Sequence, residues 1–233
     1  MSDMHKVIAG VRDAIESSRD AIAHGEAPIP PPEIARAESG VVEMVAGFAR
    51  ELHAVGGQFL GSIDPAELAA SVVSYAEQIG ARSIAIGAGI TFDTELIGEK
   101  IERAGLTVIK AVPVADIERA AMRERIARCD LAIAEADCAI ASTGTLAVIG
   151  NRDRANSLTL IPPASFIFVQ ASKMFPDMAS ALDALGPASI AAARLTLITG
   201  PSRTADIEKR IVLGIHGPKS LAVAVLWPRE SAR

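Results

Sequence analysis

Residues 83–114 read SIAIGAGITFDTELIGEKIERAGLTVIKAVPV, and this stretch decides the fold class. Two aliphatic runs, at 83–86 and 106–112, flank a segment from about Asp93 to Ala104 whose apolar residues recur at helical spacing. Short continuous aliphatic runs are typical of strands that are buried on both faces, as in parallel sheets. The stretch therefore predicts a strand–helix–strand unit of a parallel sheet.

The alternation of helix and strand continues on both sides of this stretch. Residues 41–55 and 65–79 have helical spacing, and residues 59–63 form a short strand between them. The dipeptide Asp64-Pro65 supplies a side-chain cap and a proline at the first helical position. Residues 115–129 predict one more helix. We therefore predict an α/β fold with a mostly parallel sheet and helices on both of its faces.

The pattern changes after residue 131. Five short apolar runs separated by tight turns predict a small β-rich insert, at 131–134, 138–141, 146–149, 157–161 and 166–170. Beyond the insert we predict a short helix at 178–185, a strand at 195–199, a helix at 205–213 and a last buried strand at 221–226.

The N-terminal part of the chain has a different character. Residues 6–23 have helical spacing, and the run Pro28-Ile29-Pro30-Pro31-Pro32 that follows is typical of a linker. The 233 residues suit one large domain with an extension. We predict an N-terminal helical arm with a Pro-rich linker at 1–33 and one α/β domain at 34–233. Such an arm often packs on a partner subunit, so a homo-oligomer stays open.

The composition excludes several classes of function. The net charge is −5 and no basic cluster occurs, which argues against nucleic-acid binding. The apolar stretches fall short of the roughly 20 residues that a membrane helix needs. Residues 1–20 contain no secretory apolar region, so we expect a soluble, cytoplasmic protein. Cys129 and Cys138 are too few to hold a zinc ion or an iron–sulfur cluster alone, and we expect both to be buried.

Ligands in open α/β sheets bind beyond the carboxyl ends of the strands, and four loops are candidates for this position. The strongest is Gly200-Pro201-Ser202-Arg203-Thr204-Ala205-Asp206, where the predicted helix at 205–213 begins. The N–H groups of a helix start attract anions, and the guanidinium of Arg203 suits a carboxylate or a phosphate. Helix capping explains Thr204 and Asp206 without a ligand. It leaves Arg203 unexplained, because a cation is unfavourable at a helix N-terminus.

The other three loops carry weaker signals. His216-Gly217-Pro218-Lys219 follows a left-handed Gly214 and offers two titratable groups; an ordinary turn with a solvated side chain explains Lys219, whereas His216 is the stronger candidate. Ser142-Thr143-Gly144-Thr145 is either a hydroxyl-rich hairpin turn or a small anion-binding nest. Gly87-Ala88-Gly89 lacks the third glycine of a dinucleotide fingerprint, so we predict no nicotinamide cofactor.

No catalytic pair is evident from the sequence. It contains no GxSxG, P-loop or HExxH pattern, and the four histidines are scattered. Glu135 and Asp137 would point to opposite faces of a strand, which weakens them as a pair. We therefore predict neither a metal site nor a cofactor on this chain, and whether it is an enzyme stays open.

Four segments together resemble a known family: Ala141–Leu146, Leu160–Pro163, Gly200–Glu208 and Gly214–Lys219. Their order and spacing are similar to those of the LUD-domain family, and within it to the lactate utilization proteins of the LutC (YkgG) type. The resemblance covers about residues 70–227. Two positions depart from it, since Ser142 stands where an acidic residue is frequent and Ala164-Ser165-Phe166 follows the paired prolines where a histidine is common.

The resemblance implies a fold similar to the NagB/RpiA/CoA-transferase superfamily. It also implies a role in oxidising L-lactate to pyruvate together with iron–sulfur partner proteins of the LutA and LutB type. Two hypotheses follow. The chain is an accessory subunit of that lactate utilization system and binds a small anionic ligand, or it is a stand-alone enzyme or binder of a phosphorylated metabolite or nucleotide. The ligand residues would be Ser142, Thr143, Gly144, Thr145, Gly200, Pro201, Ser202, Arg203, Thr204, Asp206, His216, Gly217 and Lys219.

Overall fold

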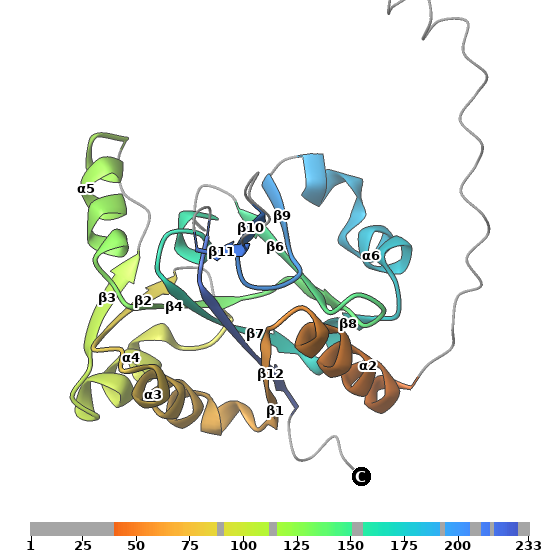
Figure 1. Cartoon of the computed structure of the whole chain (residues 1–233), viewed down its shortest axis with the longest axis horizontal. Coiled ribbons are helices and arrows are strands. Elements are labelled where there is room, and N and C mark those ends of the chain that lie inside the picture. Colours follow the sequence, from red (N-terminus) through yellow and green to blue (C-terminus); the bar gives the residue numbers. More distant parts are fainter. Residues whose placement is uncertain are drawn as a thin grey trace, which may run out of the picture. The chain divides into compact units, whose positions relative to one another are not determined.

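A sheet of six parallel strands is the centre of the fold (Figure 1). The computed structural model describes residues 40–87, 91–111, 116–150, 156–191, 194–205, 211–214 and 217–227, and the predicted arm at 1–33 lies outside them. The elements in chain order are α2 (Val41–Ala54), β1 (Gln58–Ile63), η1 (Pro65–Glu67), α3 (Leu68–Ile79), β2 (Ser83–Gly87), α4 (Thr94–Arg103), β3 (Thr107–Ala111), α5 (Asp116–Ala127), β4 (Leu131–Glu135), β5 (Cys138–Ile140), β6 (Thr145–Gly150), η2 (Asn156–Thr159), β7 (Ala164–Gln170), η3 (Ala171–Lys173), β8 (Met174–Phe175), α6 (Met178–Ala191), β9 (Arg194–Ile198), β10 (Arg203–Ala205), β11 (Ile211–Leu213) and β12 (Ser220–Leu226).

The strand order of the parallel sheet is β1-β12-β7-β4-β2-β3, and every neighbouring pair runs parallel. Successive side chains of a strand point to opposite faces, so the sheet has two apolar faces. On one face, Val72 of α3 and Ile101 of α4 lie in a buried cluster with Phe166 of β7. The predicted α/β class with a mostly parallel sheet is confirmed.

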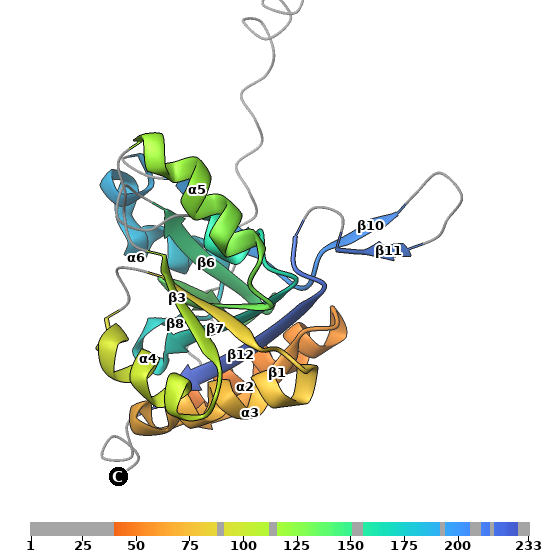
Figure 2. The same ribbon diagram turned by 90° about the vertical axis from the view of Figure 1, so that its left-hand side faces the viewer.

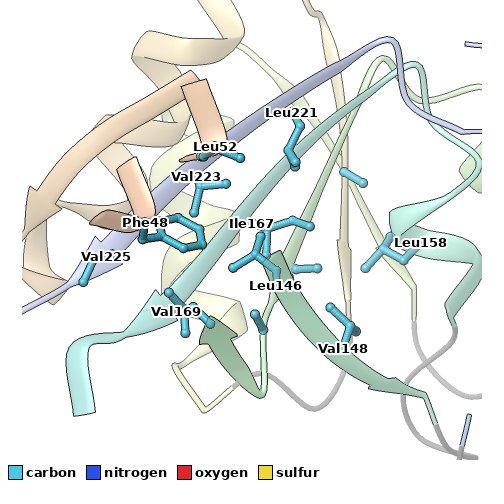
Figure 3. Close-up of a cluster of buried hydrophobic side chains, with 14 of the residues drawn as sticks. Phe48, Leu52, Leu146, Val148, Leu158, Ile167, Val169, Leu221, Val223 and Val225 are labelled. Atoms are coloured by element: carbon cyan, nitrogen blue, oxygen red, sulfur yellow. The ribbon is translucent and has the colours of Figure 1, made fainter. Parts of the chain in front are cut away.

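The other face of the parallel sheet is covered by α2, α5 and strand β6. Figure 3 shows the side chains of α2 and β6 that pack against the sheet. Phe48 and Leu52 of α2 lie in one buried cluster with Leu146 and Val148 of β6 and with Ile167 of β7. All five side chains are at most 4% exposed. Helices therefore lie on both faces of the sheet, as the alternating pattern predicts.

Four short strands form a second sheet, in the order β8-β5-β6-β9. It lies between the parallel sheet and α6, since Leu146 belongs to the core shared with the parallel sheet while Cys138 and Ala147 pack with Ala181 of α6. The predicted β-rich insert is thus right in part. Strands β5 and β6 belong to the second sheet, whereas the strands predicted at 131–134 and 166–170 are central strands of the parallel sheet.

The strand predicted at 157–161 is wrong, because these residues begin in the 3-10 helix η2. The Ser157 carbonyl accepts hydrogen bonds from the backbone N–H groups of Leu160 and Ile161, which closes a tight turn. Leu158 is 5% exposed and packs on the parallel sheet close to Gly87. The apolar run therefore fills the core from a helical turn instead of pairing as a strand.

The helix predicted at 205–213 is also wrong at the described residues. Residues 203–205 and 211–213 form the antiparallel strands β10 and β11, which extend from the parallel sheet as a hairpin (Figure 2). The β-branched residues Thr204, Ile211 and Val212 favour a strand over a helix. Gly214 after β11 has a φ of 81°, so it is left-handed as predicted, but it follows a strand and caps no helix.

Local signals fix several helix ends as the sequence predicts. The Asp64 carboxylate accepts a hydrogen bond from Ala66 N at 2.9 Å, with Pro65 as the first residue of the turn that leads into α3. Gly80 ends α3 with a φ of 70°. The Asp93 carboxylate caps α4 in the same way. These contacts satisfy helix-end N–H groups that would otherwise lack a partner.

Candidate functional site

Three of the four predicted ligand loops meet in space. The hydroxyl oxygens of Thr145 and Thr199 lie 3.0 Å apart and join the turn before β6 to the loop after β9. The Ser202 N–H donates to the Pro218 carbonyl at 2.8 Å, and the Gly214 N–H donates to the Ser202 carbonyl at 3.1 Å. We define the loop cluster as the described residues of these segments: Ser142–Thr145, Thr199–Arg203, Gly214 and Gly217–Lys219.

A chain of three threonine hydroxyls runs through the loop cluster. The Thr143 hydroxyl donates to the Thr145 hydroxyl at 2.8 Å, and Thr145 lies against Thr199. Thr145 is 2% exposed, whereas Thr143 and Thr199 are exposed. A hydroxyl has one proton and two acceptor lone pairs, so either Thr145 or Thr199 can donate in the second of these bonds.

The loop cluster is seated on the C-terminal end of α2 through its glycines. A Cβ on Gly144 would lie 2.8 Å from the Glu51 carbonyl carbon and 2.9 Å from Leu52 Cα, and Gly144 has a φ of 62°. A Cβ on Gly200 would lie 3.0 Å from a methyl carbon of Val55. These glycines allow the two loops to contact the helix backbone, so their first role is packing.

Arg203 also lies at the end of α2. A Cβ on Gly56 would meet the Arg203 guanidinium, with Cζ at 3.2 Å. The Gly56 N–H donates to the His53 carbonyl, so this is where the helix ends. A cation is favourable at a helix C-terminus because the terminal carbonyls carry partial negative charge. The interpretation of Arg203 at a helix N-terminus is therefore wrong, since β10 begins at Arg203 itself.

The segment before β12 holds the other cation of the loop cluster. The Lys219 N–H donates to the Pro163 carbonyl at 2.7 Å, and its exposed side chain packs on Gly214, where a Cβ would lie 2.9 Å from Lys219 Cε. Gly217 faces Ser202, with 3.3 Å between a Gly217 Cβ and the Ser202 Cβ. Pro201, which precedes Ser202, is half-buried, and Thr204 belongs to β10. The predicted ligand residues Asp206 and His216 lie outside the described residues.

The loop cluster lies at the amino edge of the parallel sheet, and the prediction that these loops follow its carboxyl ends is wrong. Pro163 and Lys219 directly precede β7 and β12, which start side by side with Ala164 opposite Ser220. Strand β9 does not belong to the parallel sheet and runs antiparallel to β6. The loop after β9 therefore has no place at the carboxyl edge.

A different group of polar residues occupies the carboxyl edge. Glu135 ends β4, Gln170 ends β7, Thr91 follows β2, and Lys173 ends η3. The Glu135 carboxylate is 3% exposed and accepts hydrogen bonds from Thr91 N at 2.7 Å, from the Thr91 hydroxyl at 2.9 Å and from the Gln170 amide at 3.2 Å. The Lys173 ammonium lies 3.6 Å from Glu135 Oε1. We call these four residues the Glu135 cluster.

Sequence reasoning missed the Glu135 cluster because it judged Glu135 as a partner of Asp137. The two carboxylates do serve different regions, since Asp137 accepts a hydrogen bond from Ile149 N of β6 at 2.7 Å. The useful signal was the run LAIAE itself, in which one carboxylate ends a strand whose residues are all buried. Buried charges need partners, so a lone glutamate in that position predicts a polar cluster around it.

Comparison with known proteins places this arrangement in a family. The sequence profile described as the LUD domain matches residues 45–226, which include every described strand of both sheets. The chain belongs to the LUD domain family. A DUF162 family protein from Deinococcus radiodurans shares its fold, with a TM-score of 0.59 at 20% identity over 81% of this chain and 99% of that one.

Two relatives illustrate the range of similarity within this LUD domain. The uncharacterized protein NMB1437 of Neisseria meningitidis is 34% identical over 102 residues, which cover 42% of this chain and 43% of that protein. A protein named lactate utilization protein C from Anoxybacillus flavithermus is 28% identical over 106 residues, or 46% of this chain and 48% of its own length. The matches span less than half the length of these curated relatives.

Both cysteines of this LUD domain are buried free thiols, as predicted. Burial raises the pKa of the Cys138 thiol to about 11, and the nearby Asp137 carboxylate adds to this effect. Burial also raises the pKa of Cys129, next to Asp130. A thiol reacts as its thiolate, so neither cysteine is suited to nucleophilic or redox chemistry in the folded chain.

The described residues of the LUD domain hold neither a cluster of metal ligands nor a membrane-spanning helix. Within the part of the chain that the structure describes, no three His, Cys, Asp or Glu side chains come together as metal ligands. Over the same residues, each helix is too short or too polar to cross a lipid bilayer.

Proposed function

We propose that this LUD domain acts in the utilization of lactate, as an accessory subunit beside iron–sulfur partner proteins. The observation that carries the proposal is the similarity to proteins named lactate utilization protein C, within a family profile that covers both sheets of the fold. Oxidation of L-lactate to pyruvate releases two electrons and two protons, so the reaction requires an electron acceptor.

The cysteines support a division of labour with partner proteins. An iron–sulfur cluster usually takes four cysteine thiolates, and this sequence contains two cysteines. Both are buried, and burial raises both thiol pKa values. In the proposed system the partners carry the clusters that accept electrons, and this subunit contributes binding of a small anion.

Deletion of the gene for this chain tests the role in lactate utilization. The deletion strain should fail to grow on L-lactate as sole carbon source and should grow normally on pyruvate, because pyruvate enters metabolism after the proposed step. A plasmid copy should restore growth on lactate. Unchanged growth of the deletion strain on lactate would show that the proposal is wrong.

Co-purification tests the partners separately. A tagged copy of the full chain, isolated from cells grown on L-lactate, should carry with it proteins with bound iron and acid-labile sulfide. An untagged strain processed in parallel is the control for proteins that bind the resin. Recovery of the tagged chain alone, from cells that do require it for growth on lactate, would remove the iron–sulfur partners from the proposal but retain the role.

A second candidate function is a stand-alone enzyme or binder of a phosphorylated metabolite or nucleotide at the loop cluster. The convergence of the predicted loops favours it, because the exposed side chains of Arg203, Lys219 and Thr199 would supply two cations and one hydroxyl donor for an anion. Arg203→Ala should weaken phosphate binding by about 1–3 kcal/mol, measured by calorimetry with inorganic phosphate. Arg123→Ala on the exposed surface of α5 is the matched control. Equal affinity of the two variants would argue against this site.

A further inference from the structure

The Glu135 cluster lies at the point where the strand order of the parallel sheet reverses. From β2 the chain passes through α4 to β3 at one edge, then returns through α5 to β4 on the other side of β2 and continues to β7. Helix α4 covers one face of the parallel sheet, where Ile101 is buried. After β4 the chain passes to the small sheet, which lies on the opposite face. In open α/β sheets, ligands bind at such a reversal, outside the carboxyl ends of the strands.

The contacts of Glu135 bridge this reversal directly. Thr91 follows β2 and donates two hydrogen bonds to Glu135 at the end of β4. Gln170 at the end of β7 donates to Glu135 at 3.2 Å and to the Thr91 hydroxyl at 3.1 Å. Three strands thus place polar side chains on one spot, and these residues are 35 to 79 positions apart in the sequence.

The four residues of the cluster differ in exposure. The Glu135 carboxylate is 3% exposed, whereas Thr91 is exposed, Gln170 is half-buried and the Lys173 side chain is 35% exposed. Removing a carboxylate from water is unfavourable, so its hydrogen-bonding partners must offset the lost hydration. The cluster thus joins a buried, hydrogen-bonded carboxylate to an accessible ammonium, and a few convergent polar groups of this kind fix the orientation of a small ligand in a binding site.

Lys173 is the group that a ligand would meet first. Its ammonium lies 3.6 Å from Glu135 Oε1, which is beyond the 2.7–3.2 Å of an N–H···O hydrogen bond. Over the described residues, the ammonium donates no hydrogen bond to another side chain or to the backbone. An ammonium carries three donors, so Lys173 can bind an oxygen anion while it stays paired with Glu135.

The two charges together select the class of ligand. A plain carboxylate would gain Lys173 but would also be repelled by Glu135. A carboxylate with a hydroxyl on the neighbouring carbon gains a second contact, because that hydroxyl can donate to Glu135 in place of the Gln170 amide, whose bond to Glu135 is longer than either bond from Thr91. The displaced amide can then donate to the carboxylate of the ligand.

We propose that the Glu135 cluster is a binding site for a 2-hydroxy carboxylate, with Lys173 on the carboxylate and Glu135 on the hydroxyl. The choice of lactate among such molecules rests on the proposed function. The site itself rests on the geometry, and it lies at the opposite edge of the parallel sheet from the loop cluster.

Calorimetry on the full purified chain tests the site with three probes. L-lactate should bind, whereas propionate, which lacks the hydroxyl, and lactamide, which lacks the charge, should each bind at least ten-fold more weakly. Equal binding of L-lactate and propionate would contradict the role of Glu135, and absence of L-lactate binding would overturn the proposal.

Variants of the cluster complete the test. Lys173→Met and Glu135→Gln should each weaken L-lactate binding at least ten-fold. Lys173→Arg should retain most of the affinity, because the positive charge at position 173 is kept. Lys100→Met and Glu102→Gln, both on the exposed face of α4, are the matched controls. Circular dichroism confirms folding before each titration, and Lys173→Arg together with Gln170→Leu keeps the test decisive if Glu135→Gln fails to fold. Wild-type affinity of Lys173→Met would overturn the site.

Growth separates this site from the proposed function. If deletion abolishes growth on L-lactate and the Lys173→Met copy restores it fully, the site is wrong and the function stands. If deletion leaves growth unchanged, the function is wrong, and the calorimetric result alone decides whether the site binds 2-hydroxy carboxylates.

Discussion

The Arg203 guanidinium lies over Gly56, at the point where α2 ends. Gly56 has a φ of 83°, a conformation that L side chains rarely adopt, and it leaves room for the cation beside the last carbonyls of the helix. The pair therefore joins the start of the β10–β11 hairpin to the helix that carries the rest of the loop cluster.

Gly56→Ala should lower the free energy of unfolding by about 2–4 kcal/mol, because the new methyl group both strains the backbone and displaces Arg203. Arg203→Ala in the same chain should recover only the part due to displacement. Urea denaturation of both single variants and the double variant measures this coupling. Strict additivity of the two substitutions would show that Arg203 does not occupy the space over Gly56.

Gly144→Ala should be among the most destabilising glycine substitutions in the described chain. Its Cβ would collide with the backbone of Glu51 and Leu52, which cannot move aside as a flexible side chain can. The expected loss is about 2–5 kcal/mol, from backbone strain and overpacking together. Gly105→Ala is the matched control, since Gly105 has a φ of 86° but no atom within 4 Å of its Cβ position. It should lose only the strain, about 1–2 kcal/mol; equal losses in thermal unfolding would refute the packing of the 142–145 turn on α2.

Asp130 should make stability depend on pH in acid. Its carboxylate accepts hydrogen bonds from Arg82 N, Ser83 N and the Ser83 hydroxyl at 2.8–2.9 Å, and the Arg82 N–H contributes most to lowering the pKa of Asp130. A lowered pKa in the folded state gives stability that is present above the unfolded pKa, about 3.9, and is lost as pH falls through the folded pKa.

Asp130→Asn should therefore be less stable than the wild type near neutral pH, by about 1 kcal/mol, since bonds to a charged acceptor become bonds to a neutral one. The difference should shrink as pH falls below about 4. Urea denaturation at pH 7 and pH 3 measures it, with Glu102→Gln as the exposed control. A difference that is constant across this range would contradict the lowered pKa.

The two thiols should resist alkylation while the chain is folded. An unperturbed cysteine is about half ionised at pH 8.5, whereas a pKa of about 11 leaves well under ~1% of Cys138 as thiolate at that pH. Iodoacetamide at pH 8.5 should modify both cysteines rapidly in urea and at least ten-fold more slowly without it, as measured by mass spectrometry. Rapid modification of Cys138 in the native chain would show that its surroundings are open.

Local patterns were sufficient to predict the α/β region of the chain. Residues 41–135 alternate between helices and strands, and the ends of these elements carry their own signals, such as the Asp64 cap and the Gly80 stop. These features depend on residues at most four positions apart. The sequence could therefore predict both the elements and their parallel arrangement.

The site could be predicted only in part, because sheet membership is a tertiary property. The runs at 195–199 and 221–226 are both predicted as strands, yet β9 lies in the small sheet and β12 in the parallel sheet. The edge at which the loop cluster lies followed from that difference. Glu135 was missed for the same reason, since its partners Thr91, Gln170 and Lys173 are brought to it only by the completed sheet.

The position of β12 has a consequence for how the chain acquires its structure during synthesis. This strand is the last described one along the chain, yet it lies between β1 and β7 and is the only parallel-sheet neighbour of β1 among the described strands. Until residues 220–226 have been made, Gln58–Ile63 has no strand to pair with. The edge of β7 that pairs with β12 also has no partner until then. Pairings this distant in sequence form slowly, so the nascent chain exposes an apolar strand edge until β12 has been synthesised, and open edges of this kind promote aggregation.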